Sequence, residues 1–310
     1  MHITRTRKSP SIIRSAWLVA AVIVLSSLVG CNTVAKYREA RATFNRAAEI
    51  ENGVKIGALK DTPAIEDPMD PEQRILTPRL AENEELRSLY RAALATLQSI
   101  DGQGEAELHR HELLADKLTL EALCHWRLGE DDKAEDVGEK AAKLFSGNSP
   151  QKPEKRSRDS YMIQALPGLI MNDQAHRMIL EKQPLDAKDF KEIKDLLIAR
   201  DDCAWTHIHN TRIEAERGNH DIKDYLLHAE IAVYRNLMEA YGVSKDTVPT
   251  EGGENVAFEN SKENLPKAKC LLKELKARDS DKYLDWLGTF GLSDDRVVEV
   301  NEDDCAKAIR

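Results

Sequence analysis

Apolar residues recur every three or four positions over long stretches of this chain, which is the spacing of an amphipathic α-helix. The clearest stretch runs from Asp221 to Tyr241 and ends before Gly242. Another runs from Asp186 to Arg217 and ends at Gly218, a residue type common at helix C-termini. Because few residues separate them, we expect an antiparallel helix hairpin. The residues on the two stripes are Phe190, Ile193, Leu197, Ala204, Ile208, Thr211 and Ala215, then Ile222, Leu226, Ala229, Val233, Leu237 and Ala240.

The remaining sequence also favours an all-α fold. The whole chain is 41% hydrophobic and only 5% aromatic, and its frequent Ala, Leu, Glu and Lys residues favour helices. No segment requires a β-sheet, although Val297 to Val300 is predicted as a brief extended segment. Further helices are expected at residues 33–53, 78–100, 105–128, 132–145, 160–182 with an interruption at Pro167-Gly168, and 265–278, with a short helix around Trp286.

Proline and charge patterns divide the chain into regions. We expect an N-terminal helical region at residues 31–145, a C-terminal helical region at 160–290 and an acidic tail at 291–310. Residues 57–78 are rich in proline and are predicted to form a surface connection within the first region. The basic segment at 152–158 is interpreted as a solvated loop between the two regions.

The N-terminal 30 residues form a separate segment. Its only charged side chains are Arg5, Arg7, Lys8 and Arg14, and an uncharged run of 16 residues follows them. A spanning helix needs about 20 apolar residues, so the pattern favours a cleaved signal peptide over a permanent transmembrane segment.

The end of that run, Leu28-Val29-Gly30-Cys31, resembles the lipobox of bacterial lipoproteins. The resemblance implies cleavage of residues 1–30 and lipidation of Cys31. Because Asn32 rather than an aspartate follows, it also implies the outer membrane, with the body facing the periplasm. The alternatives are a plain signal peptide or an uncleaved anchor, in which Cys31 is an ordinary buried thiol.

Cleavage would make the body more acidic. The signal segment holds four basic residues and no acidic ones, so the net charge would change from −9 to −13. Such a charge repels nucleic-acid phosphates and anionic head groups, so we expect no nucleic-acid partner. Attachment to the membrane is therefore expected through the lipid on Cys31.

The segment from Leu118 to Phe145 resembles a tetratricopeptide repeat, in which two antiparallel helices place small residues where they cross. It implies that Ala134 and Ala141 lie at a close crossing. Because Ala40, Ala93 and Ala134 do not follow the usual period of about 34 residues, we expect an irregular helical-repeat solenoid, with a non-repeating helical bundle as the alternative. The residues that carry the resemblance are Ala122, Trp126, Gly129, Ala134 and Ala141.

Four further cysteines lie in the body. Cys124 and Cys203 fall on apolar stretches of predicted helices, so we expect both to be buried thiols. Cys270 and Cys305 lie in the C-terminal region, outside the most regular stripes, and the expected compartment permits disulfides. We therefore predict a disulfide between Cys270 and Cys305.

No motif specifies a reaction. The sequence His111-Glu-Leu-Leu-Ala115 begins like the zinc motif H-E-x-x-H but lacks its second histidine. The paired histidines at 109 and 111, and at 207 and 209, point to different helix faces. We therefore expect no metal, cofactor or catalytic residue. Three tryptophans are interpreted as core residues rather than the lining of a groove: Trp126, Trp205 and Trp286.

These observations favour a lipid-anchored scaffold that binds a protein or peptide of the cell envelope through a helical surface. The alternative is an envelope hydrolase with carboxylates in a helical cleft, which sequence spacing alone does not reveal.

Overall fold

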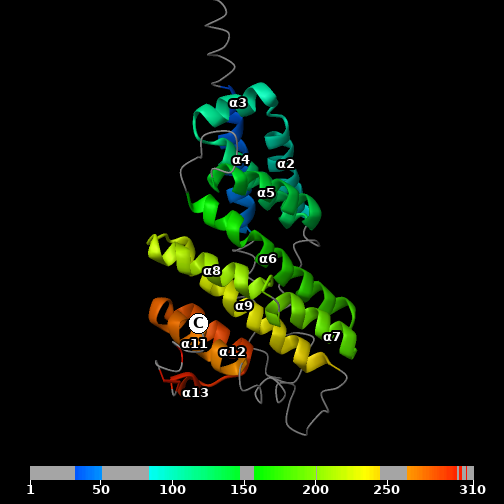
Figure 1. The fold of residues 1–310 in the computed structure, drawn as a ribbon, viewed down its shortest axis with the longest axis vertical. Coiled ribbons are helices and arrows are strands. Elements are labelled where there is room, and N and C mark those ends of the chain that lie inside the picture. Colours follow the sequence, from blue (N-terminus) through cyan, green and yellow to red (C-terminus); the bar gives the residue numbers. More distant parts are fainter. Residues whose placement is uncertain are drawn as a thin grey trace, which may run out of the picture. The chain divides into compact units, whose positions relative to one another are not determined.

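The computed structural model describes residues 32–50, 84–146, 157–199, 201–244, 264–298, 300–301 and 305. This part of the chain is all-α, and its only β-type pairing is an isolated bridge between Leu185 and Ser244. The chain forms two compact units, Met1–Lys155 and Arg156–Arg310, hereafter unit 1 and unit 2 (Figure 1). The expected division into two helical regions has a similar boundary.

Unit 1 is built around a nearly buried helix, α4. It packs against α5, α2 and α3, and most of its side chains are buried. The helix at residues 32–50 adds Tyr37, Ala40 and Ala47 to the core. The helices of unit 1 are the one at residues 32–50, α2 (Glu84–Gln98), α3 (Gly102–Arg110), α4 (Leu114–Arg127) and α5 (Asp131–Ser146).

The prediction of a single helix at residues 105–128 is wrong, because the structure has two helices there, α3 and α4. Asp101 caps α3 by accepting a hydrogen bond from the Gly104 amide at 2.9 Å, which starts the helix earlier. Glu112 adopts a positive φ of 56°, and the Leu113 amide donates to the Leu108 carbonyl. This helix end is hard to predict from the sequence, because the residue with a positive φ that follows a helix is usually glycine.

Unit 2 is a layered helical assembly. Helices α6, α8 and α9 pack on one another, and α11 packs against α9, α12 and α13 (Figure 1). The expected hairpin of 186–217 and 221–241 is present in its second half as α8 and α9, joined by a short turn. The elements are α6 (Arg158–Glu181), α7 (Ala187–Lys194), the π-helical η3 (Asp195–Ala199), α8 (Ala204–Arg217), α9 (Ile222–Val243), α11 (Asn264–Arg278), α12 (Ser280–Phe290) and α13 (Asp294–Val298).

Three boundary predictions in unit 2 are wrong. Helix α6 continues through Pro167, because its packing against α8 and α9 offsets the lost backbone hydrogen bond. The segment 186–217 is broken before α8, where the buried Cys203 is extended at the N-cap. The segment expected to be extended at residues 297–300, within the acidic tail, instead includes the end of α13.

Gly168 allows close packing of α6 on α8. A Cβ at this position would lie 2.7 Å from the Ala204 carbonyl oxygen and 2.8 Å from the His207 Cβ. We expect Gly168→Ala to lower the free energy of unfolding by about 1–2 kcal/mol, because overpacking exceeds the gain in helix propensity. The matched control is Gly288→Ala in α12, where a Cβ meets nothing within 4 Å. Urea unfolding should show a gain for this control, and a gain at both positions would contradict the prediction.

Candidate functional site

The residues of the repeat-like pattern lie together in unit 1, in the pair formed by α4 and α5. Ala122 and Trp126 are buried on α4, and Ala134 and Ala141 are completely buried on α5. Because α5 packs directly on α4, the two alanines lie in the interior of this pair. Small residues at a crossing allow two helices to approach closely.

We expect Ala134→Leu to lower the free energy of unfolding by about 1–3 kcal/mol, because the larger side chain has no space between α4 and α5. Ala92→Leu on the exposed side of α2 is the control and should change stability little. Thermal unfolding compares them, and equal midpoints for the two variants would contradict the buried crossing.

Gly129 shapes the turn between α4 and α5. It adopts a φ of 77°, which favours glycine. The Gly129 amide donates to the Trp126 carbonyl at 2.9 Å and the Glu130 amide donates to the His125 carbonyl at 2.9 Å. This is the Schellman arrangement of a helix C-terminus. It places the Glu130 side chain beside that of His125.

His125 and Glu130 form a hydrogen-bonded pair at the end of α4. The buried His125 donates through Nδ1 to Glu130 Oε2 at 2.5 Å, and Lys133 donates to the same oxygen at 3.2 Å. Burial acts to raise the pKa of Glu130, but the hydrogen bonds from His125 and Lys133 outweigh it and lower that pKa. Glu130 is therefore a carboxylate at neutral pH.

A pocket of about 290 Å³ lies beside this pair, between one face of α2 and the turn from α4 to α5. Its wall on α2 follows positions separated by three or four residues, so these side chains share one helix face. The lining combines two guanidinium groups, one amide, apolar carbons and one carboxylate. The lining residues are Arg87, Arg91, Leu94, Ala95, Gln98, Leu128 and Glu130.

A second polar cluster joins α4 to α3. The buried Lys117 donates to Glu121 at 2.7 Å and to Glu105 of α3 at 3.0 Å. These two carboxylates balance the positive charge of the ammonium group. Burial, assisted by Glu121, raises the pKa of the Cys124 thiol well above its ordinary value. Cys124 is free and buried, and such a thiol is unreactive. The hydrogen bond from Lys117 to Glu105 therefore links α4 to α3.

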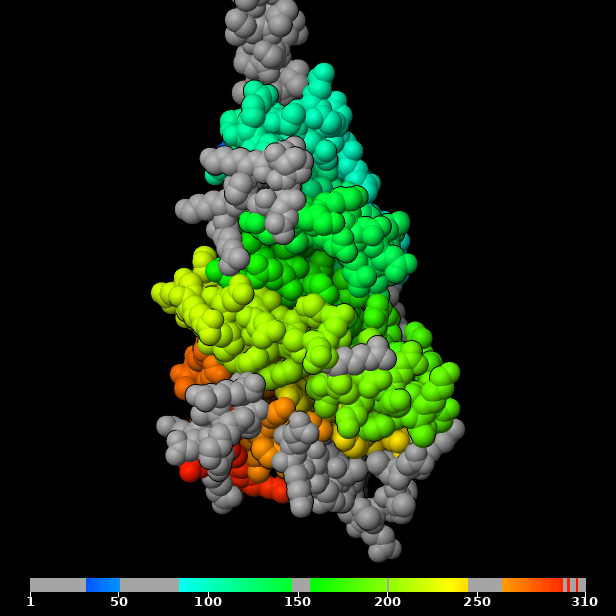
Figure 2. All heavy atoms as spheres, in the orientation of Figure 1, coloured from blue at the N-terminus to red at the C-terminus, as the bar shows by residue number. Residues whose placement is uncertain are grey.

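Among the described residues, a large charged network in unit 2 joins α8, α9 and α11. Arg212, only 2% exposed, donates to Glu230 at 2.7 Å, to Glu216 at 2.5 Å and to Glu274 at 2.9 Å. Arg278 binds Glu216 and Glu274 from the outer side, at 2.6 Å and 2.5 Å. Figure 2 shows the outer surface of α8 as a yellow-green band.

Glu230 and Glu274 are the unusual carboxylates of this network. Glu230 is fully buried, accepts from Arg212 and contacts His209 through Oε1, while its Oε2 has no hydrogen-bond partner among the described residues. Burial raises the pKa of Glu274, and Glu216 and Glu230 add to this effect, against the opposing influence of Arg212 and Arg278. This network was not among the features predicted from the sequence.

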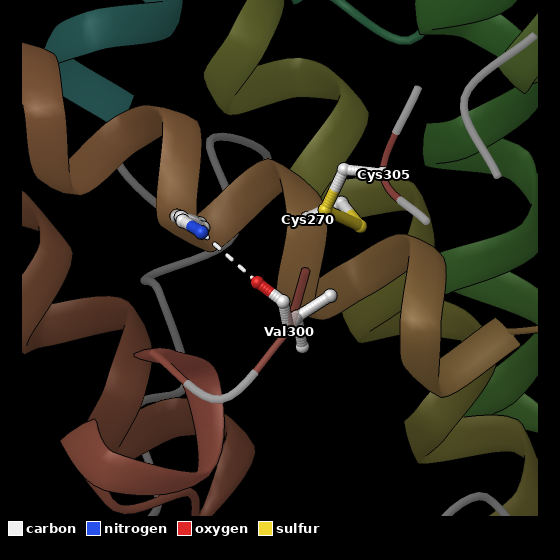
Figure 3. The surroundings of a disulfide bond; sticks show 4 residues. Cys270, Val300 and Cys305 are labelled. Atoms are coloured by element: carbon white, nitrogen blue, oxygen red, sulfur yellow. Dashed lines mark hydrogen bonds between the residues drawn. A yellow bond between two sulfur atoms is a disulfide. The ribbon is translucent and has the colours of Figure 1, made fainter. Parts of the chain in front are cut away.

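The C-terminal cysteines are joined, which is the pairing that the sequence predicted. Cys270 of α11 and Cys305 form a disulfide, and Lys273 donates to the Val300 carbonyl at 2.9 Å (Figure 3). Cys203, like Cys124, is a buried free thiol. Cys31 lies outside the described residues, so its lipidation stays a prediction.

The tryptophans of the body differ in burial. Trp126 is buried, whereas Trp205 and Trp286 are partly exposed. Trp205 stacks on His209 with ring centroids 4.7 Å apart, and Trp286 donates to His228 Nδ1 at 3.0 Å. Burial lowers the pKa of His228, so its imidazole is neutral and accepts this hydrogen bond. Trp126 thus packs within unit 1, and Trp205 and Trp286 pack within unit 2.

Neither a metal-binding cluster of His, Cys, Asp and Glu nor a helix long and apolar enough to span a membrane occurs within the described ranges. Comparison of the chain with protein-family models, with curated proteins and with solved structures finds no match.

Proposed function

We propose that the protein is a lipoprotein anchored to the outer membrane through Cys31, and that its helical body binds a protein or peptide of the cell envelope. The observation that carries the anchor is Leu28-Val29-Gly30-Cys31 after a basic start and an uncharged run of 16 residues. Several acyl chains on one cysteine would hold the protein stably, since each buried methylene contributes about 0.8 kcal/mol.

Binding is supported by the chemistry of the body. In the described part of the chain, the buried cations Lys117 and Arg212 each bind carboxylates of their own unit, which favours a structural role for these charges. The pocket in unit 1 offers opposite charges and apolar carbons at the edge of a helix pair. Irregular repeats of such pairs form extended surfaces suited to polypeptide partners.

Cys31→Ser tests the anchor. In a bacterial host fed with labelled palmitate, the natural chain should incorporate the label and fractionate with membranes, whereas the variant should stay unlipidated and uncleaved. Cys203→Ser is the control, because a buried thiol should not affect labelling. Labelled Cys31→Ser protein would refute the anchor.

Asn32→Asp tests the location with Cys31 intact. We expect this variant to move from the outer-membrane to the inner-membrane fraction, since an aspartate after the cysteine resembles the retention signal of enteric bacteria. Equal distribution of the two forms would contradict the outer-membrane assignment.

Crosslinking and affinity capture from envelope fractions test the binding role. We expect the lipidated chain to retain a specific protein partner. A matched capture with Ala134→Leu should lose that partner only to the extent that unit 1 unfolds. Absence of any specific partner would contradict the scaffold.

Glu274 favours the envelope hydrolase as a second candidate. Its raised pKa and the nearby carboxylates of Glu216 and Glu230 are features of some acid catalysts. Glu274→Gln distinguishes the candidates, because a hydrolase should lose turnover of peptidoglycan or peptide while unit 2 stays folded. Absence of turnover in the natural chain would favour the scaffold.

A further inference from the structure

The pocket of unit 1 has an ordered lining. Arg87, Arg91, Leu94 and Gln98 follow one face of α2 and extend over about 16 Å at 1.5 Å per residue. Leu128 and Glu130 form the opposite wall, so one wall carries two cations and the other an anion, with apolar carbons on both.

Charged groups on both walls of the pocket can be reached by a ligand. Arg91 is 52% exposed and its partner Glu84 is 75% exposed, at 2.8 Å, so a ligand can displace this weak surface pair. Glu130 accepts hydrogen bonds from His125 and Lys133 through Oε2, and its side chain is 38% exposed, so a ligand can approach this carboxylate.

We infer that this pocket binds a small zwitterion with an apolar side chain, of the size of a dipeptide, and this assignment rests on the proposed peptide-binding function. The guanidinium of Arg91 matches a carboxylate, because the planar fork donates two parallel hydrogen bonds. The Glu130 carboxylate matches an ammonium group. Leu94 and Leu128 cover an aliphatic side chain between them, and the volume of about 290 Å³ suits a small ligand.

The test uses the full chain in detergent micelles and titration calorimetry with four forms of alanyl-leucine. These are the free dipeptide, its C-terminal amide, its N-acetyl derivative and the doubly blocked form. We expect the free form to bind best and each single block to weaken binding about 10-fold or more, because each removes a charged hydrogen bond. Tighter binding of the N-acetyl form would overturn the zwitterion in favour of a simple anion site, and equal binding of all forms would overturn both.

Variants locate the site. Arg91→Gln should weaken binding of the free dipeptide about 10-fold and leave binding of the C-terminal amide unchanged. Glu84→Gln should tighten binding, because it releases Arg91. Arg110→Gln is the matched control, an exposed arginine of α3 paired with Glu107 outside the pocket, and should have no effect. Unchanged binding in Arg91→Gln would overturn the site.

Glu130→Gln tests the opposite wall, and should selectively weaken the forms with a free ammonium. The melting temperature of this variant is measured as a control for folding. It should change little, because the amide oxygen of the glutamine remains an acceptor for His125. Failure of dipeptide binding with envelope capture intact would overturn the pocket alone, whereas loss of capture by the natural chain would overturn the proposed scaffold.

Discussion

Arg212→Met should lower the free energy of unfolding of unit 2 by about 3–5 kcal/mol. Glu230 is fully buried and Arg212 donates to it at 2.7 Å, so the substitution leaves an uncompensated carboxylate in the interior. His209 contacts the same oxygen at 3.1 Å but cannot replace the guanidinium, which also binds Glu216 and Glu274. Urea unfolding followed by circular dichroism measures the loss, and hydrogen exchange of α8 and α9 assigns it to unit 2.

The double variant Arg212→Met with Glu230→Leu separates pairing from simple packing. Removing both charges should restore much of the stability, because a buried ion pair contributes little beyond an apolar pair of similar size. Arg110→Gln, which affects an exposed pair, should change stability by less than about 0.5 kcal/mol. A double variant as unstable as Arg212→Met would mean that the loss arises from shape rather than from the unpaired charge.

The sequence predicts the helices of this protein well wherever standard stop residues occur. The stripe from 221 to 241 corresponds to α9, Ile222–Val243, and Gly129 ends the first helix of the repeat-like pair. The prediction is wrong where tertiary packing or an unusual residue intervenes. Glu112 ends α3 with a positive φ in place of glycine, and α6 tolerates Pro167 because it is packed on two sides.

The buried network was partly visible in the sequence. Arg212 lies four residues after Ile208, and Glu230 lies four residues after Leu226, so each places a charge on an apolar stripe. Opposite charges on the facing stripes of a predicted hairpin indicate a buried pair. Glu274 was not predictable in this way, because it reaches Arg212 across a separation of 62 residues.

The pocket depended still more on tertiary structure. Arg87 and Arg91 are four residues apart and share a face of α2, which the sequence allows one to infer. Glu130 faces them only because α4 packs on α2 and the Gly129 turn directs the chain back. Spacing along the sequence gives no information on such a contact between helices.

Removal of the Cys270–Cys305 disulfide should lower the free energy of unfolding by about 3–4 kcal/mol. The two residues are separated by 35 positions, and opening a loop of this length restores that much chain entropy to the unfolded state. Without the disulfide, the segment around α13 is held by non-covalent contacts such as those of Lys273 with the Val300 carbonyl and of Tyr283 with Asp294, so the loss should concentrate there.

Hydrogen exchange therefore compares oxidised protein, reduced protein and the double variant Cys270→Ser, Cys305→Ser, and should show faster exchange at residues 294–301 in the last two. Reductant should not change the double variant, which excludes an effect through the buried thiols of Cys124 and Cys203. Alkylation without reductant should label neither Cys270 nor Cys305. Full labelling of both would show that the bond does not form, and unchanged stability on reduction would show that the tail is held by its polar contacts alone.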